Sequence, residues 1–225
     1  MNHESSILWV TATGHEAAVL GTGEVLERGY YPEFQRLNDA LLITGAGMLA
    51  TAVELTAVLA AGDFDAIIHF GIAGSFDPSI PPGSVVQVIS EEIGDFGADD
   101  RGVFLPAFDI HLAHPEEFPF KRGKLTPELP AGLDTHLPKV HGVTVNTVHG
   151  EAAAIEAFRA RSEAKVESME GAAVFFAALR LNVPCLQIRA ISNFVEPRNR
   201  ESWEIGKALD ALKQELQIIK KKITD

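Results

Sequence analysis

The chain has 225 residues, 46% of them apolar, and it carries a formal net charge of −12 and a single cysteine. This length suits one domain over residues 1–225 with a buried core, and the apolar content excludes a disordered chain. The acidity argues against nucleic-acid binding, and no apolar run reaches the roughly eighteen residues of a membrane span. A lone thiol in a chain without a basic, apolar leader fits a reducing cytoplasm.

Apolar runs alternate along the chain with segments of helical period. Strands are expected over residues 7–13, 41–44, 65–70, 84–90, 140–145 and 184–191, and helices over residues 48–61, 151–161, 169–181 and 203–219. Strands separated by helices predict a largely parallel sheet that is covered on both faces. Residues 94–138 interrupt this alternation, and excursions of that length are often functional or lie at interfaces.

The segments that follow the strands are the first place to look for a binding site, because ligands bind outside the carboxyl ends of a parallel sheet. In chain order they read TGHEA, GAGML, GIAGSF, NTVHG and SNFVEPRNR, and ESMEGA begins a helix. GAGML half-matches a dinucleotide fingerprint through Gly45 and Gly47, but Ala50 occupies the third glycine position. A tight turn and a backbone site for an anion or a sugar hydroxyl both remain open there.

Two carboxylates stand out in these segments. Glu16, in TGHEA, is placed to accept a proton from water, although a first-turn helical carboxylate would look the same. In ESMEGA, Ser168 is a candidate N-cap that places Glu170 in the first helical turn. A carboxylate at that position can accept hydrogen bonds from both hydroxyls of a ribose, and Met169 beside it offers a soft apolar surface.

The GIAGSF segment offers backbone rather than side chains. Ala73 and Gly74 allow a flat ligand to approach the chain closely, and tight packing of the turn would explain them equally well. His69, inside the strand before them, is expected to be a hydrogen-bonded core histidine.

Taken in order, ATGHEA, TGAGMLA, GIAGSF, ESMEGAAV and IRAISN resemble the superfamily of purine nucleoside phosphorylases and nucleosidases, in particular the hydrolases of methylthioadenosine and S-adenosylhomocysteine. ISNFVEPRNR together with VNTV is more similar to the futalosine hydrolases of the alternative menaquinone pathway. The resemblance covers most of the chain. It implies a three-layer α/β/α sandwich around a mixed, largely parallel sheet, a small nucleoside substrate, no cofactor or metal, and a homodimer or homotetramer.

The resemblance also implies roles for single residues. Glu16 matches a general base that activates water, and Glu170 matches the carboxylate on the ribose hydroxyls, with Met169 beside it. Asn193 occupies the catalytic position where adenosine-type nucleosidases keep an aspartic acid. The residues that would line the purine site are Ala73, Gly74, Asn146, Thr147 and Val148.

The asparagine at position 193 points to the kind of purine. Hypoxanthine presents an acceptor oxygen at position 6 and, once protonated, a donor at N7, and the NH2 and C=O of an amide match that pair. Adenine presents the reverse pattern, which suits a protonated aspartic acid. An unpaired buried polar group costs about 1–3 kcal/mol, so Asn193 favours a 6-oxopurine.

Four other functions remain as alternatives. The first is a nucleosidase of the methylthioadenosine/S-adenosylhomocysteine type, and the second is a purine nucleoside phosphorylase. Phosphorolysis needs cations around a phosphate, and residues 44–48 contain no arginine. A dinucleotide-dependent oxidoreductase would rest on the Gly45 and Gly47 turn alone. A nucleotide sensor without catalytic activity would bind the same ligand and release no product.

The group at the ribose 5′ position has fewer sequence signals. Futalosine carries an aromatic carboxylate there, so the resemblance demands an apolar slot with a cationic end. Arg198 is assigned to the substrate on this ground, although an ion pair with Glu196 or Glu201 would also explain it. The other candidates are Phe96, Phe104 and Phe108 as walls and Arg101 and Arg200 as cations.

Overall fold

The computed structural model describes residues 6–21, 24–26 and 39–224. Within them the main sheet has the strand order β10-β5-β8-β9-β4-β1-β3-β2. Its strands are β1 (Ile7–Thr11), β2 (Glu24–Leu26), β3 (Asp39–Ile43), β4 (Ala66–Ser75), β5 (Val85–Ile93), β8 (Lys139–Thr144), β9 (Val166–Ser168) and β10 (Cys185–Phe194). The helices are α1 (Gly14–Leu20), α2 (Met48–Ala61), α3 (Ala152–Arg159), α4 (Gly171–Leu181) and α5 (Ile205–Thr224), with a 3-10 turn at Arg200–Ser202.

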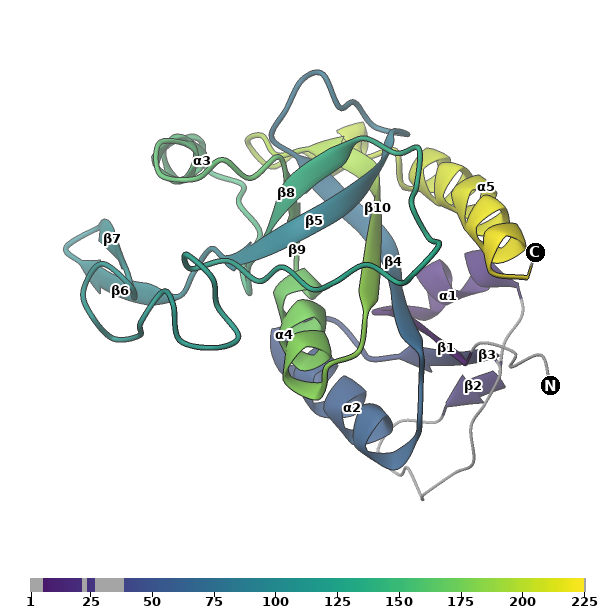
Figure 1. The fold of residues 1–225 in the computed structure, drawn as a ribbon. Helices are drawn as coiled ribbons and strands as arrows, with labels where there is room; N and C mark the ends of the chain where they lie inside the picture. The colour runs from purple at the N-terminus through teal and green to yellow at the C-terminus, as the bar shows by residue number, and fades with distance from the viewer. Residues whose placement is uncertain (1–5, 22–23, 27–38, 225) are drawn as a thin grey trace.

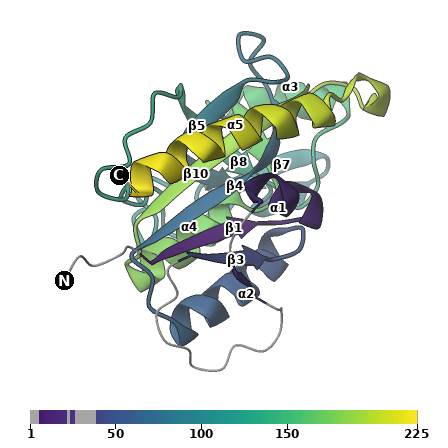
Figure 2. The same cartoon turned by 90° about the vertical axis from the view of Figure 1, so that its right-hand side faces the viewer.

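Helices cover both faces of the sheet, as Figures 1 and 2 show: α1 and α5 pack on one face, and α2 and α4 pack on the other. The alternation of side chains along β1 explains this. Leu8 and Val10 belong to the core beneath α2 and α4, whereas Ile7 and Trp9 belong to the core beneath α1 and α5. The sheet is mixed, because β5 runs antiparallel to β10 and β9 runs antiparallel to β4. The predicted three-layer arrangement is confirmed.

Strand β9 brings two parts of the sheet together. It pairs in parallel with β8, and it pairs with the end of β4 through Gly74 and Glu167. Since β4 also pairs with β10, β10 with β5 and β5 with β8, these five strands close into a ring. The closure gathers the ends of β4, β9 and β10 at one place.

Several element boundaries differ from the sequence expectations. The helix over residues 48–61 is observed with those bounds, whereas β4 and β10 continue three to five residues beyond their apolar runs because they pair with each other. Ser168 was expected to cap a helix, and this is wrong. It lies in β9 opposite Thr144, so its backbone is extended, and the N-cap is Glu170 without a side-chain capping bond.

The excursion over residues 94–138 contains one small hairpin, β6 (Gly97–Asp100) and β7 (Val103–Pro106), that projects away from the main sheet (Figure 1). At the other end of the chain, Lys221 and Lys222 lie in the last turn of α5, where cations suit the helix dipole. Among the described helices, none combines the length and the apolar character that a bilayer crossing requires.

Candidate active site

A cavity of about 320 Å³ opens where β1, β4 and β10 end, and we call it the strand-end cavity. Most of the predicted site residues line it: Glu16, Ala73, Gly74, Val148, Met169, Glu170, Asn193 and Arg198. Asn146 and Thr147 are exposed and do not line it, and the backbone N–H of Asn146 donates to the Asp95 carboxylate at 2.7 Å instead. Trp203 also lines the cavity, although it was expected only as the beginning of a helix.

Glu16 reaches the cavity from the first turn of α1. Its Oε2 accepts hydrogen bonds from the hydroxyls of Thr11 and Thr13 at 3.2 and 2.7 Å and from the Thr13 backbone N–H at 3.0 Å. Its Oε1 accepts from the backbone N–H of Ile72 at 3.0 Å. Thr13 caps the same helix in a reciprocal capping box, so one short motif ends β1, begins α1 and fixes the carboxylate. Glu16 therefore has both of the expected features: it belongs to the first turn of α1, and it lines the cavity.

Glu170 meets the glycine turn before α2. The backbone N–H of Gly47 donates to its Oε1 at 3.0 Å, so the turn that was open as an anion site holds a carboxylate of the protein itself. Gly45 and Gly47 have φ angles of 87° and 94°, which residues with a side chain rarely adopt. Burial raises the pKa of Glu170, and Glu16 adds to this, while Arg189 and the Gly47 hydrogen bond oppose it.

Arg189 is the charged residue that sequence reasoning passed over, because it sits in the apolar run of β10. It is 1% exposed, and its Nη2 lies 3.8 Å from Oε2 of Glu170. Its cross-strand neighbour is Gly71, where an added Cβ would lie 2.5 Å from Arg189 Nη1 and 2.6 Å from Glu16 Oε1. The guanidinium and the Glu16 carboxylate therefore share the space that Gly71 leaves empty.

The other carboxylate of ESMEGA, Glu167, is hydrogen-bonded to His149 rather than to the glycine turn. Glu167 borders the cavity, but its Oε1 accepts from the backbone N–H of His149 at 3.0 Å and its Oε2 contacts Nδ1 of the same residue. The His149 ring lies against Phe76 and Phe158. Both carboxylate oxygens of Glu167 are thus paired with His149, so Glu170 is the better candidate to bind a ligand beside Met169.

A bulge in β10 sets the direction of the Asn193 side chain. Ile191 pairs with Ala73 and Asn193 pairs with Gly74, so Ser192 is the extra residue. The Asn193 Oδ1 accepts from the Ser192 hydroxyl at 2.8 Å, and its Nδ2 donates to the Phe194 carbonyl at 2.8 Å. An added Cβ at Gly74 would lie 3.2 Å from that Nδ2, so glycine gives the amide room.

Arg198 and Trp203 supply an aromatic and cationic rim to the cavity. The guanidinium carbon of Arg198 lies 5.5 Å from the centre of the Trp203 ring. Arg200 lies over the same ring at 5.9 Å, and among the described residues neither arginine is ion-paired with Glu196 or Glu201.

The other candidates for a 5′ slot lie outside the strand-end cavity. Phe96 and Phe108 pack edge to face at 5.9 Å, and Phe104 lies beneath the Arg161 guanidinium at 4.3 Å. Arg101 sits in the β6–β7 turn and pairs with Asp100 at 3.0 Å. They do not reach the cavity, because the excursion folds on itself as a separate hairpin and aromatic cluster.

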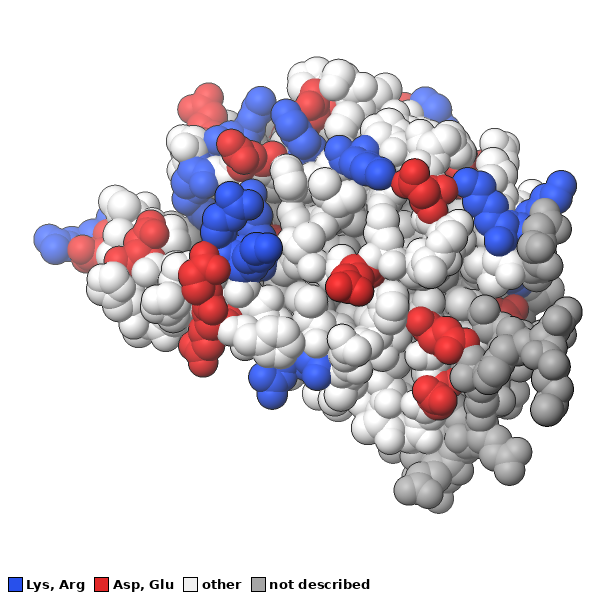
Figure 3. Space-filling model, in the orientation of Figure 1, with Lys and Arg blue, Asp and Glu red and all other residues white. Residues whose placement is uncertain are grey.

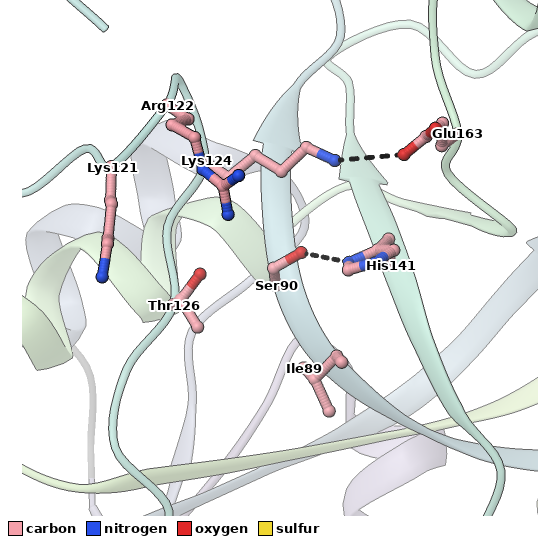
Figure 4. A pocket seen from close by; sticks show the side chains of 8 residues that line it. All are labelled: Ile89, Ser90, Lys121, Arg122, Lys124, Thr126, His141 and Glu163. Atoms are coloured by element: carbon pink, nitrogen blue, oxygen red, sulfur yellow. Dashed lines mark hydrogen bonds and ion pairs between the residues drawn. The ribbon is translucent and has the colours of Figure 1, made fainter. Parts of the chain in front are cut away.

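A second, larger cavity of about 500 Å³ lies on the excursion side of the sheet (Figure 4). Three cations line it, Lys121, Arg122 and Lys124, and Figure 3 shows Lys and Arg gathered beside the projecting hairpin. Within it Ser90 bonds to Nδ1 of His141 at 2.6 Å. None of the predicted site residues lines this cavity, so the strand-end cavity is the candidate active site.

Among the described residues, no group of three or more His, Cys, Asp or Glu side chains is placed to hold a metal ion. His69, the candidate core histidine, is 1% exposed and bonds through Nδ1 to Gln187 and through Nε2 to Arg189, both at 3.1 Å.

Known proteins share this sequence pattern and this fold. A futalosine hydrolase from Streptomyces coelicolor is 36% identical over 156 residues, which are 66% of this chain but only 62% of that protein. A futalosine hydrolase from Thermus thermophilus is 32% identical over 174 residues, 76% of each chain. The solved 5′-methylthioadenosine/S-adenosylhomocysteine nucleosidase from Helicobacter pylori has a TM-score of 0.75 at 16% identity, covering 98% of this chain and 99% of that one.

The nucleosidase structure is similar in fold alone at that identity, whereas the family model described as the phosphorylase superfamily matches residues 6–224. This chain therefore belongs to the phosphorylase superfamily, and the two curated relatives described above are named futalosine hydrolases.

Proposed function

We propose that the protein hydrolyses the N-glycosidic bond of futalosine and releases hypoxanthine, as a step toward menaquinone. The relatives named futalosine hydrolase support the reaction class. The single observation that carries the choice of purine is Asn193, an amide placed on the rim of the strand-end cavity where a carboxyl group would suit adenine.

Hydrolysis transfers water to the ribose while the purine leaves. Glu16 takes a proton from water, the water oxygen bonds to the anomeric carbon, and the purine departs with the electron pair of the C–N bond. The purine gains a proton from solvent at N7. Positive charge builds on the ribose ring, as in glycoside hydrolysis, and the Glu16 and Glu170 carboxylates favour that charge. Glu170 accepts from the ribose hydroxyls, and Met169 packs beside them.

The leaving purine lies against the backbone of Ala73 and Gly74. The NH2 group of Asn193 donates to the oxygen at position 6, and its C=O accepts from N7–H. For this the amide exchanges its bonds with Ser192 and Phe194 for bonds with the base. The aromatic carboxylate at the 5′ end fits beside Trp203, with Arg198 as its cationic partner.

Phosphorolysis is the closest rival. Residues 44–48 contain no arginine, but Arg189 on β10 is a buried cation near Glu170 that the sequence argument did not consider. It does not favour phosphate, because it faces two carboxylates, Glu16 and Glu170. A phosphate dianion would be repelled by that pair more than it is attracted by one guanidinium. Water carries no such penalty.

The test is a product analysis by chromatography after incubation with futalosine, inosine and methylthioadenosine, each with and without phosphate. We expect hypoxanthine from futalosine at a rate that does not depend on phosphate, and slower or no release of adenine from methylthioadenosine. A sugar 1-phosphate would establish a phosphorylase instead, and faster adenine release would establish a methylthioadenosine-type nucleosidase. Tight binding without any product would indicate a sensor.

We further propose a homodimer or homotetramer. Leu49 and Val53 are adjacent on the outer face of α2 and are 79% and 59% exposed, and Phe176 is exposed on the neighbouring α4. An apolar face of this kind is typical of an interface between subunits. Sedimentation of the wild type and of Val53→Glu tests this: the variant should sediment as a smaller species, and an unchanged mass would move the interface elsewhere.

A further inference from the structure

A row of buried polar side chains crosses the sheet and ends at Arg189, whose Nη2 lies 3.8 Å from Oε2 of Glu170, a residue that lines the strand-end cavity. The row consists of Glu91 on β5, Gln187 on β10, His69 on β4 and Arg189 on β10, each at most 1% exposed. We call it the buried polar chain. Burying polar groups costs free energy unless they are hydrogen-bonded, and two of these four carry charged groups, so their burial in the sheet needs a reason.

The hydrogen bonds of the buried polar chain run in one direction. The Gln187 NH2 group donates to Oε1 of Glu91 at 2.6 Å, which leaves the Gln187 Oε1 to accept from Nδ1 of His69 at 3.1 Å. With a proton on Nδ1, the neutral ring has its lone pair on Nε2, and this atom accepts from Nη2 of Arg189 at 3.1 Å. Burial lowers the pKa of His69 and Arg189 lowers it further, so the ring stays neutral.

The far end of the chain, Glu91, sits in a space that two glycines leave open. Its cross-strand neighbour is Gly142, where an added Cβ would lie 2.7 Å from Oε1 of Glu91. At Gly171, the first residue of α4, an added Cβ would lie 2.1 Å from the same atom. Thr144 completes the setting by donating to Oε2 of Glu91 at 3.0 Å. The surroundings are shaped for this carboxyl group.

At the near end of the chain, a glycine likewise leaves space for the side chain of Arg189. Strand register puts Gln187 opposite His69 and Arg189 opposite Gly71, so the guanidinium enters the space beside Glu16. There its Nη2 has one fixed acceptor, Nε2 of His69. An arginine without such a restraint would be free to turn and form a bidentate pair with a nearby carboxylate, and that pair would reduce the ability of the carboxylate to take a proton.

We propose that Glu91, Gln187 and His69 are positioning residues, which hold the guanidinium of Arg189 in one orientation beside the carboxylates of the active site. The restraint keeps Arg189 close enough to offset the repulsion between the carboxylates, yet turned away from a bidentate pair with Glu16. The proposal rests on the proposed function, because the role of the orientation is to keep Glu16 available as the base.

The test is a double-mutant cycle on kcat with Gln187→Met and Arg189→Met. Gln187→Met keeps the length of the side chain and breaks the buried polar chain in the middle. We expect kcat on futalosine to fall about ten-fold or more with KM changed less than about three-fold. In the Arg189→Met background the same change should have little further effect on kcat, since it acts through Arg189.

Two further variants separate positioning from loss of packing. Ile188 lies between Gln187 and Arg189 on β10, but its side chain faces the α5 side of the sheet. Ile188→Val should therefore lower the melting temperature and leave kcat unchanged. His69→Gln keeps an acceptor within reach of Arg189, and it should retain more activity than His69→Leu. Independent effects of Gln187 and Arg189 on kcat, or an equal loss in Ile188→Val, would overturn the proposal.

A measurement without any substrate covers the cases in which a variant does not fold or the function is wrong. The ring nitrogens of His69 in the wild type, observed by ¹⁵N NMR from pH 5.5 to 8, should show a neutral ring with its proton on Nδ1 throughout. A proton on Nε2, or a charged ring, would overturn the buried polar chain itself. A wild type that does not cleave futalosine, with the His69 signals as expected, would instead overturn the proposed function.

Discussion

Replacing Asn193 by aspartate should change which purine the enzyme prefers. In the present structure the Asn193 amide donates to the Phe194 carbonyl at 2.8 Å and accepts from the Ser192 hydroxyl at 2.8 Å. An ionised carboxylate would keep the second bond, but it would set an oxygen against the carbonyl in place of the first. A protonated carboxyl group keeps both bonds.

The magnitude follows from that lost bond. Leaving a fully buried acceptor unpaired costs about 1–3 kcal/mol, and the Phe194 carbonyl is only partly buried, so we expect a cost of about 1 kcal/mol. One pKa unit corresponds to 1.36 kcal/mol, so the introduced carboxyl group should titrate about one unit above an ordinary aspartate. In its protonated form it can give a proton to N7 and accept from a 6-amino group. We therefore expect the ratio of kcat/KM for the 6-amino analogue of futalosine to that for futalosine to rise at least ten-fold, about 1.4 kcal/mol.

The assay is chromatographic measurement of adenine and hypoxanthine release by the wild type, Asn193→Asp and Asn193→Ala. The shift in the ratio should be larger at pH 5.5 than at pH 7.5, because protonation produces it. Asn193→Ala should be slow on both substrates and discriminate little between them. If the aspartate variant and the wild type give the same ratio at both pH values, the base is recognised by other groups, and our account of Asn193 is wrong.

Three more changes test the other carboxyl groups. Glu16→Gln should lower kcat by roughly 10²–10⁴-fold, with substrate binding largely kept in a titration, and an unchanged kcat would remove Glu16 from the mechanism. Glu170→Gln should lose ten-fold or more in kcat/KM on futalosine and lose less on a 2′-deoxy analogue, and equal losses would mean that Glu170 does not hold the diol. Burial raises the pKa of Glu91 from 4.5 to about 7. The hydrogen bond from Gln187 and the charge of Arg189 oppose this rise, and the charge of Glu92 adds to it. The folded state therefore binds this proton more tightly, and the free energy of unfolding should fall by about 3 kcal/mol as the pH rises from about 4.5 to 7. Urea denaturation of Glu91→Gln should show a flatter pH dependence, and an identical curve would contradict the shift.

The sequence by itself determined those features that depend on neighbouring residues. Alternating apolar runs predicted the layers, and a helix over residues 48–61 was predicted with its observed bounds. The parallel-sheet rule pointed to the strand ends, where Glu16, Glu170 and Asn193 indeed lie around one cavity. Local patterns succeed here because helix period, strand period and turn residues are set by the backbone within a few positions.

The tertiary structure decided which distant residues meet. Ser168 looked like a cap but belongs to β9, because a strand of three residues is recognised only through its partners β8 and β4. The aromatic side chains of the excursion, Phe96, Phe104 and Phe108, were candidates for the 5′ slot until the folding of the hairpin placed them elsewhere.

Arg189 is the clearest case of what only the tertiary structure could provide. In the sequence it is one charged residue within an apolar strand, and nothing near it explains its burial. Its partners come from far along the chain: His69 lies 120 residues away, and Gly71 makes room for it. Those contacts depend on the register between β4 and β10. A shift of one residue would turn Arg189 to the opposite face of the sheet, and register is fixed by the packing of the whole sheet rather than by any local signal.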